Sequence, residues 1–218
     1  IISGPTGVGK TTTGAQFIQA AAGRGERSAI YMFEETERTF LERCSSVDIP
    51  VSDMRDRGTL SIEEIEALEL SPQEFAHEVR TDVEAKDTQI VMIDGINGYD
   101  LSIRGDDSEL RRKLHTLCRY LKGVGVTVIL VDEVSSITGE FAVTEGGISY
   151  IADNIVFLRH IEMEGELRKV IGVLKKRTSD FERTLRDFQI TEHGITIGEP
   201  LTNLRGILHG TPEWTDDG

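Results

Sequence analysis

The stretch Gly4-Pro5-Thr6-Gly7-Val8-Gly9-Lys10-Thr11 matches the phosphate-binding loop pattern G-x-x-x-x-G-K-[ST] at every fixed position. It follows the apolar end of a strand, Ile1-Ile2-Ser3, and it precedes a helical pattern over Thr12 to Gly23. In such a loop the backbone N–H groups converge on phosphate oxygens at the positive end of the helix dipole. The alternative interpretation is a glycine-rich turn that happens to precede a helix.

The loop predicts a site for ATP with Mg²⁺. Lys10 can reach the β- and γ-phosphates, and the Thr11 hydroxyl can ligate the metal. The residues expected to bind the nucleotide are Gly4, Pro5, Thr6, Gly7, Val8, Gly9, Lys10, Thr11 and Thr12.

A second acidic element completes the metal site. Thr88 to Asp94 is a continuous apolar run that ends in an aspartate, which is typical of a strand buried on both faces of a parallel sheet. An acidic residue at that end is the Walker B arrangement, so Asp94 is expected to hold Mg²⁺ directly or through water. Alternatively, Asp94 caps the turn into Gly95.

Hydrolysis also needs a carboxylate that orients the attacking water, and the residue after Asp94 is a glycine. The best candidates are Glu34 and Glu35, which close the second predicted strand, Ser28 to Phe33. Glu133, at the end of the strand that begins at Val126, is next in line. Alternatively, Glu34 and Glu35 only supply negative charge ahead of a helix capped by Thr36.

The rest of the chain alternates helices and strands up to Glu133 and then turns to closely spaced strands. Helices are predicted to begin at the capping box of Ser71 and at Asp107 or Ser108, and the leucine stripe of the second helix is expected to pack in the core. Residues 48–70 are expected to be irregular, apart from a short strand at 59–62. Later strands are predicted over 154–160, 167–177, 186–191 and 195–197, and loops over 95–106 and 135–147.

These patterns predict an α/β fold with a mainly parallel central sheet, flanking helices and appended antiparallel strands at the C-terminal side. Residues 1–199 are expected to form one ATPase domain and residues 200–218 a tail with a frayed end. Because the chain opens on the loop strand without an initiator Met, an N-terminal part is expected to be missing.

Composition limits the function classes. The 218 residues carry a formal net charge of −14, which argues against a nucleic-acid partner because phosphate backbones attract basic surfaces. No apolar run is long enough to span a membrane, so we expect a cytoplasmic protein that has no membrane among its partners. The five histidines lack metal spacing, and the two cysteines, Cys44 and Cys118, read as buried hydrophobic residues.

Several stretches together resemble the KaiC-like domains of the RecA superfamily. They are Gly4 to Thr12, Phe33 to Thr36, Ile93-Asp94, Ile151 to Arg159, Val173 to Arg177 and Phe188 to Ile197. The resemblance implies a RecA-like fold, ATP with Mg²⁺, and a homo-oligomeric ring, commonly a hexamer, with nucleotide at subunit interfaces.

The resemblance also implies roles for individual residues. Glu34 and Glu35 match the family's catalytic glutamates, and Lys175 and Arg177 match a basic pair that reaches the neighbour's phosphates. Residues i and i+2 of a strand face the same side, which is consistent with that pairing. Ordinary solvated cations are the alternative. Ser149 matches the first of two phosphate acceptors, while Tyr150 replaces the second.

Three functions remain open at this point. The first is a regulatory or signalling ATPase with an unidentified protein partner and possible autokinase activity at Ser149. The second is a scaffold that ATP assembles with negligible turnover. The third is a RecA-like recombination or repair factor, against which the acidic composition counts.

Overall fold

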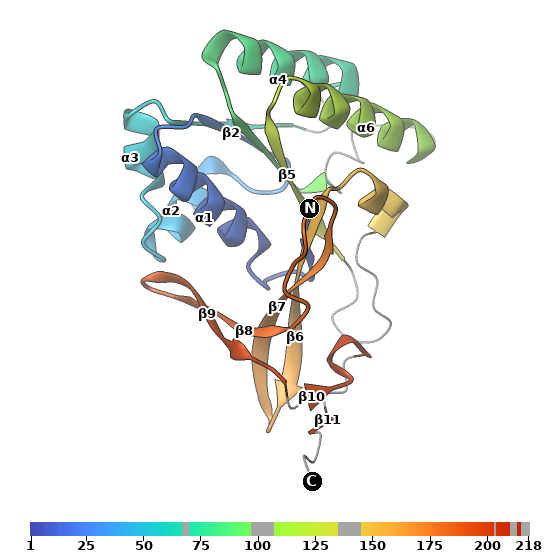
Figure 1. Ribbon diagram of the computed structural model, residues 1–218. Coiled ribbons are helices and arrows are strands. Elements are labelled where there is room, and N and C mark those ends of the chain that lie inside the picture. The colour runs from blue at the N-terminus through green and yellow to red at the C-terminus, as the bar shows by residue number, and fades with distance from the viewer. Residues whose placement is uncertain (67–69, 97–106, 135–144, 203, 210–212, 215–218) are drawn as a thin grey trace. The chain divides into compact units, whose positions relative to one another are not determined.

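Short apolar segments form the buried parallel strands of this chain, and longer strands of mixed polarity follow later in the sequence. The computed structural model describes residues 1–66, 70–96, 107–134, 145–202, 204–209 and 213–214 (Figure 1). The main sheet has nine strands, which confirms the predicted RecA-like α/β class with parallel strands and C-terminal antiparallel strands. The chain divides into two compact units, one of residues 11–131 and one of residues 1–10 and 132–218.

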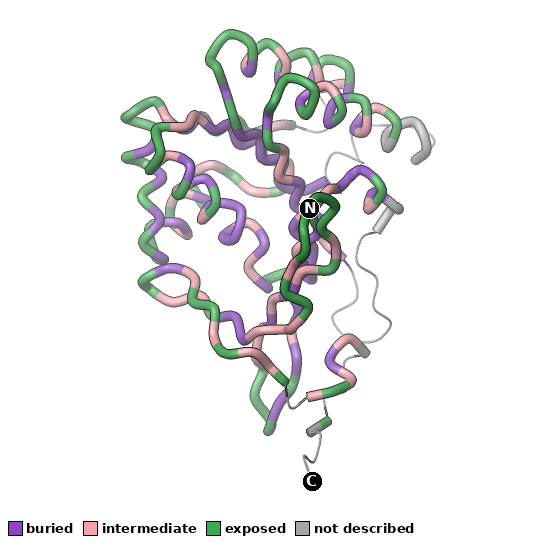
Figure 2. The backbone as a smooth tube through the Cα atoms, viewed as in Figure 1, coloured by how far each residue is buried: buried purple, intermediate pink, exposed green. Residues whose placement is uncertain are grey.

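In the unit of residues 11–131, helices and strands alternate along the chain. Its strands are parallel and lie in the sheet in the order β3-β2-β4-β5. Every residue of β2 and of β4 is buried, as a strand covered on both faces requires (Figure 2). The elements, of which α1 and β5 also reach into the other unit, are α1 (Lys10–Gly23), β2 (Ser28–Met32), α2 (Glu37–Ser45), α3 (Val51–Asp56), β3 (Leu60–Glu64), α4 (Pro72–Lys86), β4 (Ile90–Asp94), α6 (Asp107–Gly123) and β5 (Thr127–Glu133).

The helices of this unit lie on both sides of its strands. Figure 1 shows α1 on one side and the pair α4 and α6 on the other. The pair is joined by the Arg80 guanidinium, 4.4 Å from the centre of the Tyr120 ring, and by the Tyr120 hydroxyl, which donates to Glu84. The predicted core role of the α6 stripe is confirmed for the buried residues Leu114, Leu117 and Leu121.

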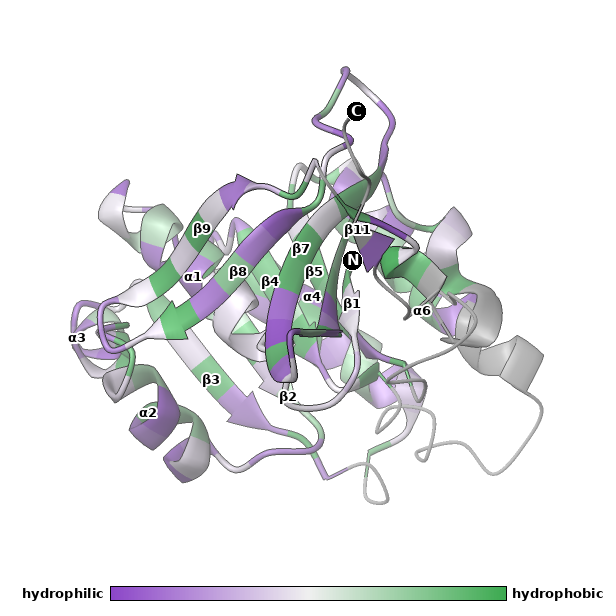
Figure 3. Cartoon of the chain, turned by 90° about the horizontal axis from the view of Figure 1, so that it is seen from below, coloured by the Kyte–Doolittle hydropathy of each residue, from purple (hydrophilic) through white to green (hydrophobic). Residues whose placement is uncertain are grey.

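The unit of residues 1–10 and 132–218 is mostly antiparallel. Strand β1 pairs in parallel with β6, and β6, β7, β8 and β9 follow one another as antiparallel neighbours. Hydrophilic and hydrophobic residues both occur along β7 and β8 (Figure 3). The elements are β1 (Ile2–Gly4), η1 (Glu145–Tyr150), β6 (Asn154–Met163), β7 (Glu166–Lys176), β8 (Arg186–Thr191), β9 (Gly194–Pro200), β10 (Leu204–Arg205), η2 (Ile207–His209) and β11 (Glu213–Trp214).

Three described residues after Pro200 pack against the antiparallel strands. Leu201, Leu204 and Ile207 pack with a cluster from β6 and β7, which contains Ile161, Met163 and Val170. The buried Arg159 guanidinium in β6 donates to the backbone oxygen of Leu208 at 2.8 Å. Tertiary packing therefore holds this segment, whose sequence carries no strong periodicity.

The structure differs from the sequence predictions in residues 48–70 and in the length of β9. Residues 48–70 are not simply irregular, since they contain α3 and a strand, β3, that runs to Glu64. Strand β9 extends from Gly194 to Pro200, beyond the predicted 195–197. Most of the predicted loops at 95–106 and 135–147, and the end at 215–218, lie outside the described residues. Within the described residues, no helix has both the length and the apolar character to cross a membrane.

Candidate nucleotide site

The phosphate loop follows β1 and is backed by strands that come late in the sequence. A Cβ atom at Gly4 would lie 2.5 Å from the backbone oxygen of Leu158 in β6. Gly9 has φ +112°, a backbone conformation that residues with a side chain rarely adopt, and a Cβ there would clash with Ile190 in β8. Both glycines are therefore required by the loop's close approach to the antiparallel strands.

Lys10 is held inside this loop. Its side chain is only 8 % exposed, and its ammonium donates to the backbone oxygen of Pro5 at 2.9 Å and to Oε2 of Glu133 at 3.2 Å. Glu133 ends β5 and is separated from Lys10 by 123 positions. The structure therefore brings Lys10 together with Glu133, which the sequence analysis names after Glu34 and Glu35 as a candidate for the catalytic base.

Lys169 is a second cation at the loop, and sequence reasoning missed it. It lies on β7 and donates to the backbone oxygen of Gly7 at 3.2 Å, across 162 positions of the chain. Partial burial lowers the pKa of its ammonium. No local pattern signals such a contact, because it depends on how the strands are ordered in the sheet.

The basic pair at the end of β7 faces its own chain. Lys175 donates to the backbone oxygen of Ser149 at 2.9 Å, and Arg177 donates to that of Tyr150 at 3.2 Å. Arg177 also lies 3.6 Å from the Asp153 carboxylate. Both side chains therefore point toward the short helix η1, in which Ser149 is the next-to-last residue.

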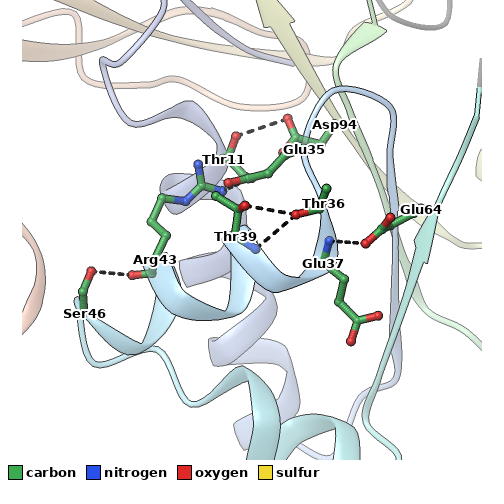
Figure 4. A network of polar contacts seen from close by, with 9 residues as sticks. All are labelled: Thr11, Glu35, Thr36, Glu37, Thr39, Arg43, Ser46, Glu64 and Asp94. Carbon is green, nitrogen blue, oxygen red and sulfur yellow. Dashed lines mark hydrogen bonds and ion pairs between the residues drawn. The ribbon is translucent and has the colours of Figure 1, made fainter.

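Thr11 and Asp94 meet at the end of β4. The Thr11 hydroxyl donates to Oδ1 of Asp94 at 3.2 Å, and Asp94 is 8 % exposed (Figure 4). Burial raises the pKa of the Asp94 carboxyl from 3.8 to about 6, against the opposing effects of the Thr11 hydrogen bond and the charge of Arg43. A cation beside this carboxylate would relieve that penalty.

Glu34 reaches the same edge of the parallel strands. In the register of β2 and β4, Met32 lies opposite Asp94, and the Phe33 amide donates to the Asp94 backbone oxygen at 3.0 Å. A Cβ at Gly95 would lie 2.8 Å from Cγ of Glu34. Glu34 therefore occupies the space that a side chain at position 95 would need, next to Asp94.

Glu35 has a defined partner in the same unit. Its Oε2 atom accepts from the Arg43 guanidinium at 2.6 Å, and its side chain is 19 % exposed (Figure 4). Thr36 caps α2 as predicted, because its hydroxyl accepts from the Thr39 amide at 3.3 Å. Sequence reasoning assigned no role to Arg43, whose long side chain reaches back along α2 to Glu35, eight residues earlier.

The donor set around Asp94 suits Mg²⁺, which prefers oxygen ligands and takes few of them from the protein when phosphates supply the rest. A hydroxyl and a carboxylate oxygen are present in Thr11 and Asp94. The described residues contain no group of three or more His, Cys, Asp or Glu side chains that could hold a metal by themselves. The arrangement therefore fits a metal shared with a phosphate ligand.

Comparison with known proteins assigns the chain to a family. The family model described as "ATPase: KaiC" matches residues 1–202. Circadian clock protein KaiC3 of Synechocystis sp. is 27 % identical over 99 % of this chain and 42 % of its own length. The circadian clock oscillator proteins KaiC of Acaryochloris marina and Thermostichus vulcanus are 24 % and 26 % identical over 97 % of this chain and 40 % of theirs. The chain thus spans about two fifths of the length of these relatives. It belongs to the KaiC family of ATPases.

Proposed function

We propose that this chain is a Mg²⁺-dependent module that binds and hydrolyses ATP and regulates a protein partner. The observation that carries the proposal is the contact between Thr11 and Asp94, because it joins the last position of the phosphate-loop motif to the Walker B carboxylate. Lys10 and Thr11 are consecutive residues of α1, so the backbone itself links this contact to the loop.

Each part of the loop has a defined task in binding. The loop amides and Lys10 bind the phosphates, and the Glu133 carboxylate that accepts from Lys10 yields its place to a phosphate oxygen. Thr11 and Asp94 hold Mg²⁺, which supplies charge neutralisation for the transferring phosphoryl group. Asp94 already lies 3.2 Å from the Thr11 hydroxyl and therefore needs no large movement to serve as a ligand beside it.

Turnover requires a carboxylate that orients water and accepts its proton, and Glu34 and Glu35 supply it. Their position just after β2, whose last residue Met32 pairs with Asp94 in the β2–β4 register, supports this role. Glu34 lies against Gly95, whereas Glu35 is bonded to Arg43. The two residues therefore have different surroundings, although they are adjacent in the chain.

Calorimetry with Mg-ATP, together with a phosphate-release assay, tests the proposal. Lys10→Ala should show no detectable binding, while Lys86→Ala, which removes an exposed lysine that pairs with Asp82 on α4, should bind like the parent. The Glu34→Gln, Glu35→Gln double variant should keep ATP and lose phosphate release.

The outcomes separate the competing functions. Binding of ATP by Lys10→Ala with the affinity of the parent would overturn the site. Binding without phosphate release by the parent would favour a scaffold that ATP assembles. Unchanged release by the double variant would transfer the role of base to Glu133.

We further propose that the module assembles as a homo-oligomeric ring, a hexamer as in the family, with Lys175 and Arg177 directed to the neighbour's phosphates. Both cations are bonded to backbone oxygens of η1, partners that they could exchange for a nucleotide. Ser149 lies in that helix, which supports it as an acceptor of the γ-phosphoryl group. Peptide mass spectrometry after incubation with Mg-ATP tests this, and unmodified Ser149 during active hydrolysis would exclude it.

A further inference from the structure

Arg43 is the cation bonded to the Glu35 carboxylate. It comes from the last turn of α2 and reaches back eight residues, past the Thr36 cap, to make a 2.6 Å contact. The guanidinium lies 5.6 Å from the centre of the Phe40 ring, and Phe40 is fully buried. The Arg43 side chain points back toward Glu35, before the start of its own helix (Figure 4). Its position over the Phe40 ring favours this orientation.

The pair is less exposed than the Arg38–Glu42 ion pair of the same helix. Arg38 and Glu42, on the same helix, form a contact of 3.0 Å with side chains that are 86 % and 67 % exposed. Arg43 and Glu35 are 35 % and 19 % exposed. A less hydrated pair is screened less by solvent, so the charge of Arg43 acts more strongly on its surroundings.

Those surroundings are rich in carboxylates. Glu34 and Glu35 are adjacent, and both raise the pKa of Asp94 through charge repulsion. Arg43 acts on Asp94 with the opposite sign. A triphosphate would bring further negative charge to this edge, so an ordered cation among these carboxylates limits their mutual repulsion.

We propose that Arg43 is a positioning residue for ATP hydrolysis, which holds the Glu35 carboxylate in place near Asp94 and offsets its charge. The proposal rests on the function proposed above and adds a residue that the phosphate loop, the Walker B strand and the glutamate pair do not include. Arg43 acts through Glu35 and does not itself contact the reacting atoms. Its loss should therefore affect turnover more than nucleotide binding.

The test compares Arg43→Met, Arg43→Lys and Glu35→Gln with the double variant Arg43→Met, Glu35→Gln. Arg38→Met is the matched control, because it removes the same residue type from an exposed ion pair of the same helix. Phosphate release gives kcat and KM, calorimetry gives the Kd of Mg-ATP, and thermal melting reports folding. Arg43→Gln, which keeps a polar side chain, replaces Arg43→Met if that variant does not fold.

Arg43→Met should lower kcat about tenfold or more while the Kd of ATP changes less than about threefold, since misplacing a catalytic group costs mainly turnover. Arg43→Lys should recover part of kcat, and Arg38→Met should match the parent. The double variant should be no slower than the slower single variant, because both substitutions remove one interaction.

Each contrary outcome has its own meaning. A parent that releases no phosphate overturns the proposed function, and this inference with it. A parent that turns over while Arg43→Met keeps its kcat overturns the inference alone. Effects that multiply in the double variant, or a Kd that rises in proportion to the loss of kcat, also overturn it, because Arg43 would then act independently of Glu35 or on binding.

Discussion

At the scale of single residues, the candidate site contains a buried carboxylate, Asp94, whose charge lowers the free energy of unfolding. Asp94 is nine-tenths buried, and burial raises the pKa of its carboxyl from 3.8 to about 6. Between these values the folded chain binds more protons than the unfolded chain, so the free energy of unfolding falls as pH rises through this window. The loss persists at neutral pH, where Asp94 is ionised.

Asp94→Asn should therefore stabilise the nucleotide-free protein at neutral pH. A shift of roughly two pKa units corresponds to a gain of up to about 3 kcal/mol at pH 7, with little or no gain below pH 4. Urea unfolding in the presence of EDTA from pH 4 to pH 7 measures the difference between variant and parent.

The control for this prediction is Asp56→Asn, which removes one carboxylate from an exposed position at the end of α3. A difference between Asp94→Asn and the parent that stays constant across the pH range would show that burial does not raise the pKa of Asp94. The same variant should lose Mg-ATP affinity, which would link the cost in stability to the metal site.

At the scale of elements, local capping and tertiary packing contribute differently to the helices. Ser71 and Glu74 form the predicted capping box of α4, in which the Ser71 hydroxyl accepts from the Glu74 amide at 3.3 Å and Glu74 accepts from the Ser71 amide at 2.9 Å. By contrast, α3 begins after Pro50 without a side-chain cap and depends on the buried Val51 and Met54. The local sequence therefore specifies α4, whereas α3 depends on tertiary packing.

Ser71→Ala should lower the free energy of unfolding by about 1 kcal/mol, because it leaves an amide of the first turn without its acceptor. Thr81→Ala, at an exposed position within the same helix, should be neutral or slightly stabilising, since alanine is the better helix former. Urea unfolding of both variants against the parent measures the two effects. Equal changes for the two would mean that the capping box contributes nothing specific.

At the scale of the whole molecule, a shared site predicts complementation between defective subunits. If Lys175 and Arg177 act on a neighbour, a mixture of Lys10→Ala and Arg177→Ala subunits should regain phosphate release, because some interfaces then combine an intact loop with an intact arginine. Each variant alone should be inactive. Light scattering with and without ATP reports whether a ring forms.

Lys176→Ala is the matched control for this mixing experiment, because Lys176 is exposed between the two named cations and its loss should leave phosphate release unchanged. Absence of rescue in rings shown by native mass spectrometry to be mixed would mean that Arg177 serves its own subunit. Arg177 would then act only through its contacts with Tyr150 and Asp153 of its own chain.

Much of the fold could be predicted because it depends on short-range patterns. The strands at Ser28 and Thr88 are apolar runs, α4 has its capping box, and the antiparallel strands after Asn154 are closely spaced. The prediction failed for α3, which is only six residues long, since one and a half turns show too little periodicity to distinguish a helix from a loop.

The sequence by itself determined the phosphate-loop motif, the apolar strand that ends in Asp94 and the paired glutamates proposed for catalysis, because each is a run of adjacent residues that a local pattern reveals. Only the tertiary structure decided which side chains meet them. Glu133 joins Lys10 across 123 positions, and Lys169 joins Gly7 across 162. Such contacts depend on strand order and register, which burial of the whole sheet selects and no local pattern encodes.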